Sequence, residues 1–482
     1  MKSSPITVSV SIYQRAGIIA LVVASIFSIG FFQSDEHFQI LEFAGMKMGM
    51  IDASAMPWEY AHQMRSAFQP LLVVWSHQLL GLAGVESPFV ITAILRLCSA
   101  ALTLYSMLLI YRVYAPKYQE GPERKWFGYL SFLLWFMILV GVRFSSEGWS
   151  GSLIVIGCSI YFLRANSWSN FLKIGVLFGL AYLCRYQVSL IVFGFVSWLL
   201  FIHKEKFGHL MILGAGILGA MILGLIIDYW FYGEWTWTFW NYIDQNIIHD
   251  KVSNFGVDPW WSYLPKIILA LIPPFSLLPI LCLIYLLIRN PRHELVWLFI
   301  PFLFIHFMIG HKELRFLFPL VGFLPALVME GIRYYQGDNR AAFYAKRGTR
   351  RFGRTYAVLN TLLLLFICFT PFDRTTPLYQ YIYQNYKEPT TLYFIETDPY
   401  KEGHLRYYRR PNLEIVHIDS LSEIMENNQH GVQLFATERP MQLDPTATQL
   451  ALRFKTLPEW VYRLNFNGWI ERTYVWYLYE KE

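Results

Sequence analysis

The stretch PFLFIHFMIGHKELRFLFPLVGFLPALVM (residues 301–329) contains two apolar runs that are suited to hydrocarbon, with a short charged segment between them. His311, Lys312, Glu313 and Arg315 fall within five positions of this segment. Ionisable residues close to a membrane are costly and tend to be functional. The stretch therefore predicts a membrane protein that carries a charged site between two of its helices.

The composition of the whole chain agrees with lipid as its surroundings. Of its 482 residues, 55% are hydrophobic and 15% charged, and the mean hydropathy is +0.35. Soluble domains usually contain about 25% charged residues. The net charge of +6 does not indicate a nucleic-acid partner, because the basic residues cluster in short loops. All five cysteines lie in apolar segments, which excludes a disulfide framework and a cysteine metal site.

The apolar runs predict about eleven membrane-spanning helices, since about 20 apolar residues cross a bilayer. The first run is too long for a cleavable signal and is predicted to be an anchor. The segment 71–84 is apolar but short, and fits a re-entrant or interfacial helix. The predicted spans are residues 13–33, 88–112, 126–142, 149–163, 169–184, 188–203, 208–232, 263–288, 295–310, 316–333 and 355–371.

Lysine and arginine predict the orientation of these helices. The loop 333–354 has seven Lys or Arg residues against one acid, whereas the segments 34–69 and 233–262 are acidic or nearly neutral. Basic loops face the cytoplasm, so the N-terminus is expected inside and the C-terminus outside. Residues 1–371 are then a transmembrane domain, whose outer loop 34–87 contains interfacial helices.

Residues 372–482 are more polar and predict a small extracytoplasmic α/β domain. A helix is expected near SLSEIMENN (420–428). The predicted strands are TLYFIET (391–397), LEIVHID (413–419), VQLFAT (432–437) and RTYVWYLYE (472–480).

Unusual polar residues collect on the predicted outer side of the membrane. They share one membrane boundary and do not trace a path through its middle, which favours a reaction at the outer face with a lipid-borne reactant over transport. These residues are Asp35, Glu36, Arg65, Ser66, Arg143, Ser145, Glu147, Arg185, Asp228, Asn241 and Asn246, followed by the charged segment after residue 310.

The segment SDEHFQILE (34–42) predicts a helix that Ser34 caps. Asp35, Gln39 and Glu42 would then share one face. This pattern is typical of a capped interfacial helix. It also fits a carboxylate that projects into an outer cavity as a general base.

The segment GHKELRF (310–316) contains the fifth outer loop; on a helix, His311 and Arg315 would share a face beside Lys312. Such cations can snorkel at a membrane edge, paired with Glu313. Three donors that converge also form a phosphate site, in which arginine gives a bidentate grip. A cationic clamp on a departing phosphate, together with a carboxylate base, predicts group transfer from a phosphate-activated donor. A single displacement on a sugar would invert its anomeric centre.

Two further features allow two interpretations each. The segment 228–265 contains six tryptophans, which fit an interfacial aromatic belt as well as stacking on sugar rings or polyprenyl chains. Arg96, Arg143 and Arg185 fit buried structural arginines as well as a ligand site.

Several motifs resemble the glycosyltransferase family 22 mannosyltransferases, which are polytopic GT-C enzymes. HKELRFLFP (311–319) looks like the family's HKE-x-RF-x-x-P signature, and SDEHFQILE is similar to its P-D-E-x-x-Q-x-x-E. PWEYAHQMRSAFQP (57–70) resembles its T-W-E-W…R-S…P segment. IDYWFYGEWTWTFWNYIDQN (227–246) with FGVDPWWSYLP (255–265) resembles its D-x-x-x-Y-G…N…G-x-x-P-W-x-x-Y segment. Ser34 and Leu314 replace the usual Pro and Glu, and RFSSEGWSG (143–151) lacks an Asn.

The resemblance implies an inverting transfer of mannose from a polyprenyl-phosphate-mannose donor to a lipid-linked glycan or glycolipid, without a metal or other cofactor. It implies Asp35 as the base, with Glu36 assisting, and Lys312, Arg315 and His311 as ligands of the donor phosphate. The remaining matched residues would support the site or bind substrate; they are Glu313, Gln39, Glu42, Trp58, Glu59, Arg65, Ser66, Arg143, Arg185, Asp228, Tyr232, Asn241, Asn246 and Trp260.

This interpretation requires the acidic pair Asp35 and Glu36 and the basic cluster in residues 311–315 to line one pocket at the non-cytoplasmic edge of the membrane. The compact length and the lack of cysteines in loops favour a bacterial inner-membrane enzyme with a periplasmic site; a eukaryotic enzyme would act in the lumen of the endoplasmic reticulum. Three alternatives remain open: transfer of another polyprenyl-phosphate sugar, a lipid or solute transporter, and a working C-terminal domain that the membrane helices only anchor.

Overall fold

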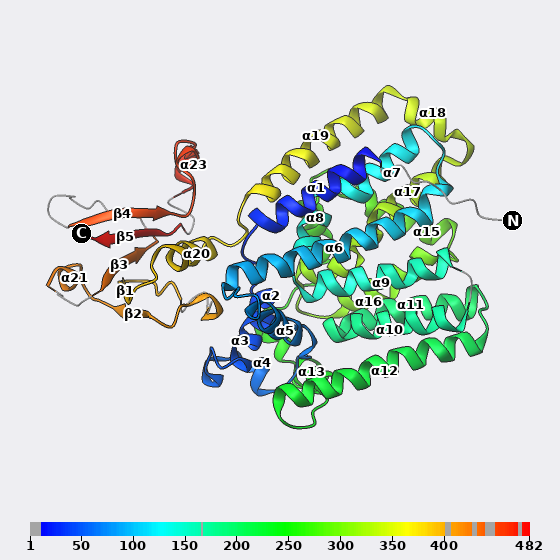
Figure 1. Cartoon of the computed structure of the whole chain (residues 1–482). Coiled ribbons are helices and arrows are strands. Elements are labelled where there is room, and N and C mark those ends of the chain that lie inside the picture. The colour runs from blue at the N-terminus through cyan, green and yellow to red at the C-terminus, as the bar shows by residue number, and fades with distance from the viewer. Residues whose placement is uncertain (1–10, 165–166, 401–405, 427–430, 439–448, 471–474) are drawn as a thin grey trace. The chain divides into compact units, whose positions relative to one another are not determined.

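The computed structural model describes residues 11–164, 167–400, 406–426, 431–438, 449–470 and 475–482, and the chain forms two compact units (Figure 1). Unit 1 comprises residues 1–26, 58–72 and 94–369, and unit 2 comprises residues 27–57, 73–93 and 370–482. Three helices contribute residues to both units: α1 (Ile12–Phe27), α5 (Phe68–Gly81) and α6 (Pro88–Tyr114).

Unit 1 is helical in its described part. Its α-helices are α4 (Trp58–Ala61), α7 (Pro122–Leu133), α8 (Trp135–Val142), α9 (Ser146–Leu163), α10 (Trp168–Cys184), α11 (Ser189–Ser197), α12 (Phe207–Tyr232), α13 (Thr238–Ile243), α14 (Tyr263–Ala270), α15 (Leu277–Arg289), α16 (Glu294–Met308), α17 (Leu324–Gln336), α18 (Arg340–Ala345) and α19 (Arg347–Phe369). Short 3₁₀ or π segments are η3 (Ala115–Lys117), η4 (Tyr186–Val188), η5 (Trp198–Ile202), η6 (Asp244–Ile248), η7 (Lys251–Phe255), η8 (Trp260–Ser262), η9 (Leu314–Phe323) and η10 (Gly337–Asn339).

Every predicted span overlaps helical residues, but several are not single α-helices. The span 126–142 is divided at Leu134, and the span 263–288 is interrupted between α14 and α15. Pro273 and Pro274 lie in that interruption and lack the N–H that a continuous helix needs. The span 316–333 begins as the 3₁₀ helix η9. Local backbone chemistry therefore divides runs that hydropathy alone treats as continuous.

Among the described residues, five helices are long and apolar enough to cross a membrane. They are Pro88–Lys117, Pro122–Val142, Phe207–Tyr232, Leu314–Ala345 and Arg347–Phe369. Shorter apolar helices are Ile12–Phe27, Trp168–Cys184, Tyr186–Ile202, Leu277–Arg289 and Glu294–Met308. The predicted number of eleven crossings stays a prediction.

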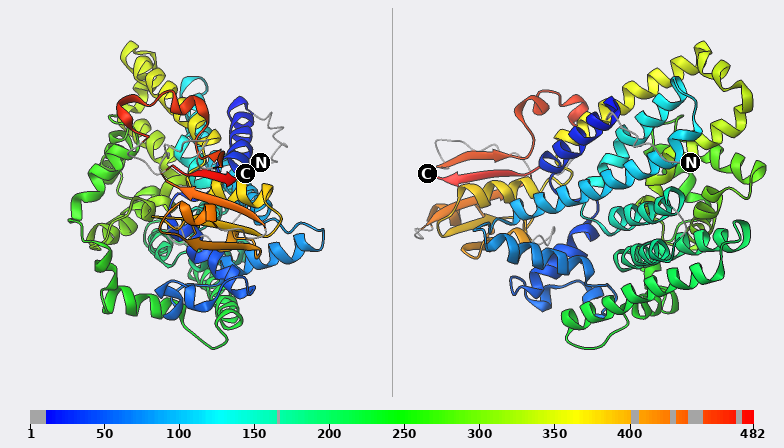
Figure 2. Two further views of the ribbon diagram at one scale, coloured as in Figure 1. Left: turned by 90° about the vertical axis from the view of Figure 1, so that its left-hand side faces the viewer. Right: turned by 45° about the vertical axis from the view of Figure 1, so that its right-hand side comes forward.

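Helices α9, α10 and α12 lie side by side in unit 1, as Figures 1 and 2 both show. Gly175 on α10 faces α12 so closely that an added Cβ would collide with the carbonyl oxygen of Leu213. Small residues allow membrane helices to approach each other in this way, because packing and not water exclusion holds them together. This row of helices carries Glu147, Arg185 and Asp228 at its ends.

Unit 2 contains a five-stranded mixed sheet in the order β2-β1-β3-β5-β4. Strand β1 is parallel to β2 and β3, and β5 is antiparallel to β3 and β4. The sheet contains the four predicted strands and adds β4; residues 472–474 and 427–428 of the predicted elements lie outside the described residues. The elements of unit 2 are α2 (Ser34–His37), η1 (Phe38–Glu42), α3 (Phe43–Lys47), η2 (Ala53–Ala55), α20 (Thr376–Asn385), β1 (Thr390–Phe394), η11 (Arg406–Tyr408), β2 (Leu413–His417), α21 (Ser422–Glu426), β3 (Val432–Thr437), β4 (Leu450–Lys455), α23 (Glu459–Tyr462), η12 (Phe466–Gly468) and β5 (Tyr477–Lys481).

Candidate active site

The charged segment after α16 is not helical over residues 311–313, so a helical face does not align His311 with Arg315. Helix α16 ends at Met308. The Lys312 ammonium turns back and donates to the carbonyl oxygens of Ile309 (2.5 Å) and Asp258 (3.1 Å). The Ile309 carbonyl directly follows the last turn of α16 and needs a donor, whereas the Asp258 carbonyl belongs to the loop before η8. The Lys312 ammonium thus connects the end of α16 to this loop, and Lys312 is only 3% exposed.

Glu313 brings together His311 and Arg315, which only a regular helix would have aligned. Its Oε1 lies 2.9 Å from His311 Nε2, and its Oε2 accepts a hydrogen bond of 2.6 Å from Arg315 Nε. Arg315 Nη2 also donates to Oε1 at 3.0 Å. Burial alone would raise the pKa of Glu313, but the hydrogen bond and charge of Arg315, with His311, hold that pKa below its usual value. The segment thus presents an ionised carboxylate between two nitrogen donors.

A buried ion pair extends this cluster into the helices of unit 1. Glu147 lies in the first turn of α9 and accepts a hydrogen bond of 2.7 Å from Arg185, which follows α10. The same Glu147 oxygen is 3.8 Å from Arg315 Nη1. The Phe316 ring lies within cation–π distance of both guanidinium groups, with centroid distances of 5.2 Å to Arg185 and 5.4 Å to Arg315. Two arginines far apart in the sequence therefore share one carboxylate and one ring.

Lys266, on α14, is a further cation of this cluster that the sequence did not indicate. Its Nζ donates to Asp258 Oδ2 and to the carbonyl oxygen of Lys312, both at 2.6 Å. The hydrogen bond from Lys266 lowers the pKa of Asp258, and burial lowers the pKa of Lys312. A lysine inside the apolar sequence YLPKIILA (263–270) is the signal that could have identified it, because such a charge needs a partner or a task.

The cluster has more positive than negative charge and opens toward solvent at one side. Its permanent cations are Arg185, Lys266, Lys312 and Arg315, and its carboxylates are Glu147, Asp258 and Glu313. The Arg185 and Glu147 side chains are 5% and 6% exposed, whereas Lys266 and Asp258 are 37% and 35% exposed. A cationic excess beside a solvent-reached rim is suited to binding an anion such as a phosphate.

Asp228, at the end of α12, holds the segment that precedes α5. Its Oδ1 accepts a hydrogen bond of 2.7 Å from the Ala67 N–H, and its Oδ2 accepts one of 2.8 Å from Thr238. The Tyr186 hydroxyl in turn donates to Thr238 at 2.7 Å. The Asp228 carboxylate is thus committed to protein donors and positions the motif 57–70.

Other matched residues serve the same segment. Arg65 donates to Glu59 at 2.6 Å, and its guanidinium lies 5.5 Å from the centre of the Tyr242 ring. Tyr232 donates to the Arg65 carbonyl at 2.8 Å, and Asn241 donates to the Gln63 carbonyl at 3.2 Å.

The consecutive residues Arg185, Tyr186 and Gln187 connect this segment to the charged cluster. Arg185 binds Glu147, Tyr186 reaches Thr238, and Gln187 donates to Tyr242. The turn η4 therefore joins the two motifs within unit 1, although they are separated by more than two hundred residues.

The remaining matched residues of unit 1 differ in exposure. Trp260 is 61% exposed, while Arg143 is 2% exposed between α8 and α9. Trp58 stacks on Phe255, with ring centres 6.3 Å apart. The Asn246 amide donates to the Tyr242 carbonyl at 3.1 Å. The Ser66 hydroxyl accepts a long hydrogen bond of 3.4 Å from the Phe68 N–H.

The acidic motif lies in unit 2, and its helix differs from the prediction. The N-cap of α2 is Gln33 and makes no side-chain cap, so the expected cap by Ser34 is wrong; Glu36 instead accepts a hydrogen bond of 3.2 Å from the Phe32 N–H. Residues 38–42 form the π-helix η1, which changes the spacing that would have aligned Asp35, Gln39 and Glu42.

Glu42 is buried at 3% exposure, whereas Asp35 and Gln39 are half-buried. Glu42 Oε1 lies 2.6 Å from His37 Nε2 and accepts a hydrogen bond of 3.1 Å from the Tyr407 N–H. Glu42 therefore connects His37 to the backbone of Tyr407 inside unit 2. The more accessible carboxylates of the motif are Asp35 and Glu36. Among the residues that the structure describes, no group of three His, Cys, Asp or Glu side chains is placed to hold a metal ion.

Comparison with known proteins gives a family match over most of the chain. A model described as the Alg9-like mannosyltransferase family matches residues 16–405. Mannosyltransferase APTG1 of Arabidopsis thaliana is 25% identical over 315 residues, which are 64% of this chain and 55% of that protein. GPI alpha-1,2-mannosyltransferase 3 of Bos taurus is 26% identical over 328 residues, or 65% of this chain and 57% of that protein. The chain thus spans little more than half the length of these relatives.

Among solved structures, the chain is similar to ArnT from Cupriavidus metallidurans, with 12% identity, a TM-score of 0.49 and coverage of 97% of both chains. That protein has been solved in the apo state and bound to undecaprenyl phosphate.

Proposed function

The chain belongs to the Alg9-like mannosyltransferase family, and from this premise we propose that it transfers mannose from a polyprenyl-phosphate-mannose donor to a hydroxyl of a lipid-linked glycan or glycolipid. The reaction inverts the anomeric centre, takes place on the periplasmic or lumenal face, and forms an α-mannoside. The observation that supports this activity most directly is the cationic cluster at the end of α16. Its four permanent cations share three carboxylates, which leaves charge to receive a phosphate.

The donor phosphate binds at this cluster. Arg315 and His311 place positive charge and nitrogen atoms beside the phosphate, and Glu313 fixes their orientation at 2.6 Å and 2.9 Å. The other His311 nitrogen, Nδ1, lies 3.2 Å from the Gly256 carbonyl oxygen. Lys312 acts through its positive charge, because its ammonium is bound to carbonyl oxygens. Preorganised cations stabilise the negative charge that grows on a departing phosphate, and they need no rearrangement during the reaction.

Asp35 is the general base, with Glu36 assisting. The Asp35 carboxylate takes the proton of the acceptor hydroxyl, whose oxygen attacks the anomeric carbon as the bond from that carbon to the phosphate oxygen breaks. The phosphate leaves with the bonding electron pair, so a single displacement inverts the sugar. No covalent sugar–enzyme intermediate forms.

The test uses the purified full-length protein with mannosyl-phosphoryl-polyprenol. We expect cleavage of the donor only when an acceptor glycan or glycolipid is present. Asp35→Asn should abolish turnover and retain donor binding, because the amide cannot accept the proton but keeps the size of the carboxylate. Asp52→Asn is the matched control: Asp52 belongs to the same predicted outer segment and is engaged locally with the Ser54 N–H at 2.8 Å. Normal turnover in Asp35→Asn would rule out the assigned base.

The acceptor is identified separately from a deletion strain. Intact-mass analysis of its lipid-linked glycans should show one species that lacks a hexose and accumulates. A deletion strain with an unchanged glycan profile would contradict the proposed acceptor class.

A further inference from the structure

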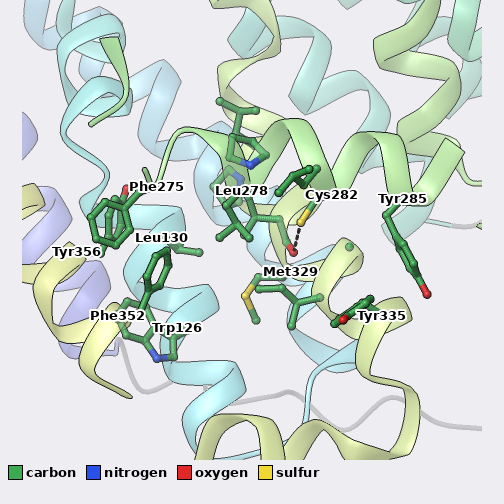
Figure 3. A pocket seen from close by; sticks show the side chains of 18 of the residues that line it. Trp126, Leu130, Phe275, Leu278, Cys282, Tyr285, Met329, Tyr335, Phe352 and Tyr356 are labelled. Carbon is green, nitrogen blue, oxygen red and sulfur yellow. Dashed lines mark hydrogen bonds between the residues drawn. The ribbon is translucent and has the colours of Figure 1, made fainter. Parts of the chain in front are cut away.

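Unit 1 contains a large apolar cavity that takes no part in the proposed reaction. Its volume is about 630 Å³, and α7, α15, α17 and α19 supply most of its wall. Figure 3 shows the side chains of Trp126, Leu130, Phe275, Tyr285 and Tyr356 around the space. A cavity with so few polar groups is suited to hydrocarbon chains, because it offers water almost no hydrogen-bond partners.

The cavity is separate from the charged cluster at the end of α16. The two share no residue. The cavity extends from Leu271, which directly follows α14, to Ile288, just before α16 begins at Glu294, whereas His311 follows the other end of α16. The 15 residues of α16 span about 22 Å as a helix. Figure 1 likewise shows α18, which borders the cavity, and α13 at different ends of unit 1.

Exposed cations surround the end of unit 1 where the cavity lies. In the part of the chain that the structure describes, none of them forms an ion pair with a carboxylate. By contrast, Arg333 and Arg340 in the same loop pair with Glu330 and Glu123. The exposed cations are Arg289, Lys346, Arg347, Arg350, Arg351 and Arg354.

Two of these cations lie beside the wall of the cavity. Thr349 and Gly353 of α19 line the cavity, and Arg350 precedes Gly353 by three residues on this helix. Lys346 lies between α18 and α19, next to the Ala345 carbonyl oxygen to which Arg350 donates. Side chains three or four positions apart are neighbours on a helix surface. An amphiphile whose chains fill the cavity would therefore meet these two cations with its head group.

We propose that the cavity binds one anionic phospholipid, with its hydrocarbon chains in the cavity and its phosphate against Lys346 and Arg350. Loops with this excess of lysine and arginine are predicted to face the cytoplasm, where anionic lipids attract basic segments. The polyprenyl donor would place its phosphate at the cluster after α16, which shares no residue with the cavity, so competition between the two lipids distinguishes them. The site thus binds a lipid that is neither donor nor acceptor.

The first test measures lipid binding to the purified full-length protein by native mass spectrometry. Phosphatidylglycerol and phosphatidylcholine with the same acyl chains are added at equal concentration. We expect one retained phosphatidylglycerol per protein and weaker retention of phosphatidylcholine. Lys346→Gln with Arg350→Gln should weaken phosphatidylglycerol binding by about tenfold or more, since each cation near an anionic lipid contributes on the order of a kilocalorie.

Lys204→Gln with Lys206→Gln is the matched control. These lysines are exposed and precede α12, outside the cavity, and the double change removes the same charge. Binding should equal that of the unchanged protein. Equal retention of both lipids, or an equal loss in the control, would refute a head-group site at Lys346 and Arg350.

A second variant tests the cavity itself. Ile284 lines the cavity and is 48% exposed, so Ile284→Trp can fill the space without displacing a buried side chain. We expect it to abolish lipid retention while donor binding stays unchanged. Retention equal to the unchanged protein would place the lipid elsewhere. Displacement of the retained lipid by polyprenyl phosphate at equal concentration would assign the cavity to the donor and overturn the proposal.

Discussion

Glu147 holds Arg185 through a hydrogen bond of 2.7 Å in a pair whose side chains are 6% and 5% exposed. The pair fixes the start of α9 to the end of α10, and Arg315 approaches the same carboxylate to 3.8 Å. Ion pairs this deeply buried are held by geometry, because each partner has lost its water. The buried Glu147–Arg185 pair therefore gives the charged cluster a rigid support.

The first prediction concerns the buried ion pair between Glu147 and Arg185. Glu147→Gln leaves two arginines near an uncharged amide, and removal of one partner from a buried pair costs up to about 3–5 kcal/mol. We expect a lower Tm of the purified protein and a loss of donor turnover. Glu120→Gln breaks the exposed pair with Arg124 and should change neither measurement, because surface pairs contribute little. An unchanged Tm for Glu147→Gln would show that Arg185 does not depend on this carboxylate.

The second prediction concerns Lys266. If its ammonium binds the donor phosphate, Lys266→Gln should raise the Kd of the donor roughly tenfold or more, as expected for a lost charge-assisted hydrogen bond. Asp258→Asn is the informative control, because it breaks the same ion pair but leaves the cation in place. Donor titration of both variants separates the two roles. Equal weakening by both would mean that Lys266 only holds the loop.

The third prediction is a pH dependence of stability. The folded pKa of Glu313 lies below its unfolded value of about 4.3. Its contribution to stability is thus complete above about pH 4.3 and is lost as the pH falls through the folded pKa. A Glu313→Gln protein lacks this contribution at neutral pH, so its Tm should fall less on acidification than that of the unchanged protein. Parallel acid profiles of Tm would contradict an ion pair with Arg315.

The fourth prediction concerns the tether at Asp228. Asp228→Asn replaces one acceptor oxygen with an N–H group and disturbs either the Ala67 or the Thr238 hydrogen bond. Hydrogen exchange should become faster over residues 58–68, with a loss of about 1–3 kcal/mol for a disrupted buried hydrogen bond. Asp250→Asn, at an exposed loop position, is the control and should leave that exchange unchanged. Unchanged exchange in both variants would show that Asp228 does not hold the segment.

The sequence identified most helices but not their internal breaks. Hydropathy counts side chains, so it located the apolar runs around α9, α10 and α12. It could not place the division at Leu134 or the 3₁₀ geometry of η9, because these depend on backbone hydrogen bonds that side-chain polarity does not report.

For the candidate site, the sequence singled out the residue types but not their arrangement. A shared face of His311 and Arg315 would need regular helical spacing, whereas Lys312 turns back to bind the carbonyl oxygens of Ile309 and Asp258. Similarly, the sequence placed Glu42 on one helical face with Asp35, but Glu42 is buried and accepts a hydrogen bond from a backbone N–H 365 residues away.

By itself the sequence determined that the chain is helical and apolar, where its charges gather, and which family motifs it carries, because these follow from composition and local order. Only the tertiary structure decided that Glu313 orients His311 and Arg315 and that Glu147 is shared by two arginines. It also decided that Lys266 binds Asp258 and the Lys312 carbonyl oxygen. Each of these relationships depends on hydrogen bonds between distant or irregular segments, and no periodic pattern along the chain encodes such contacts.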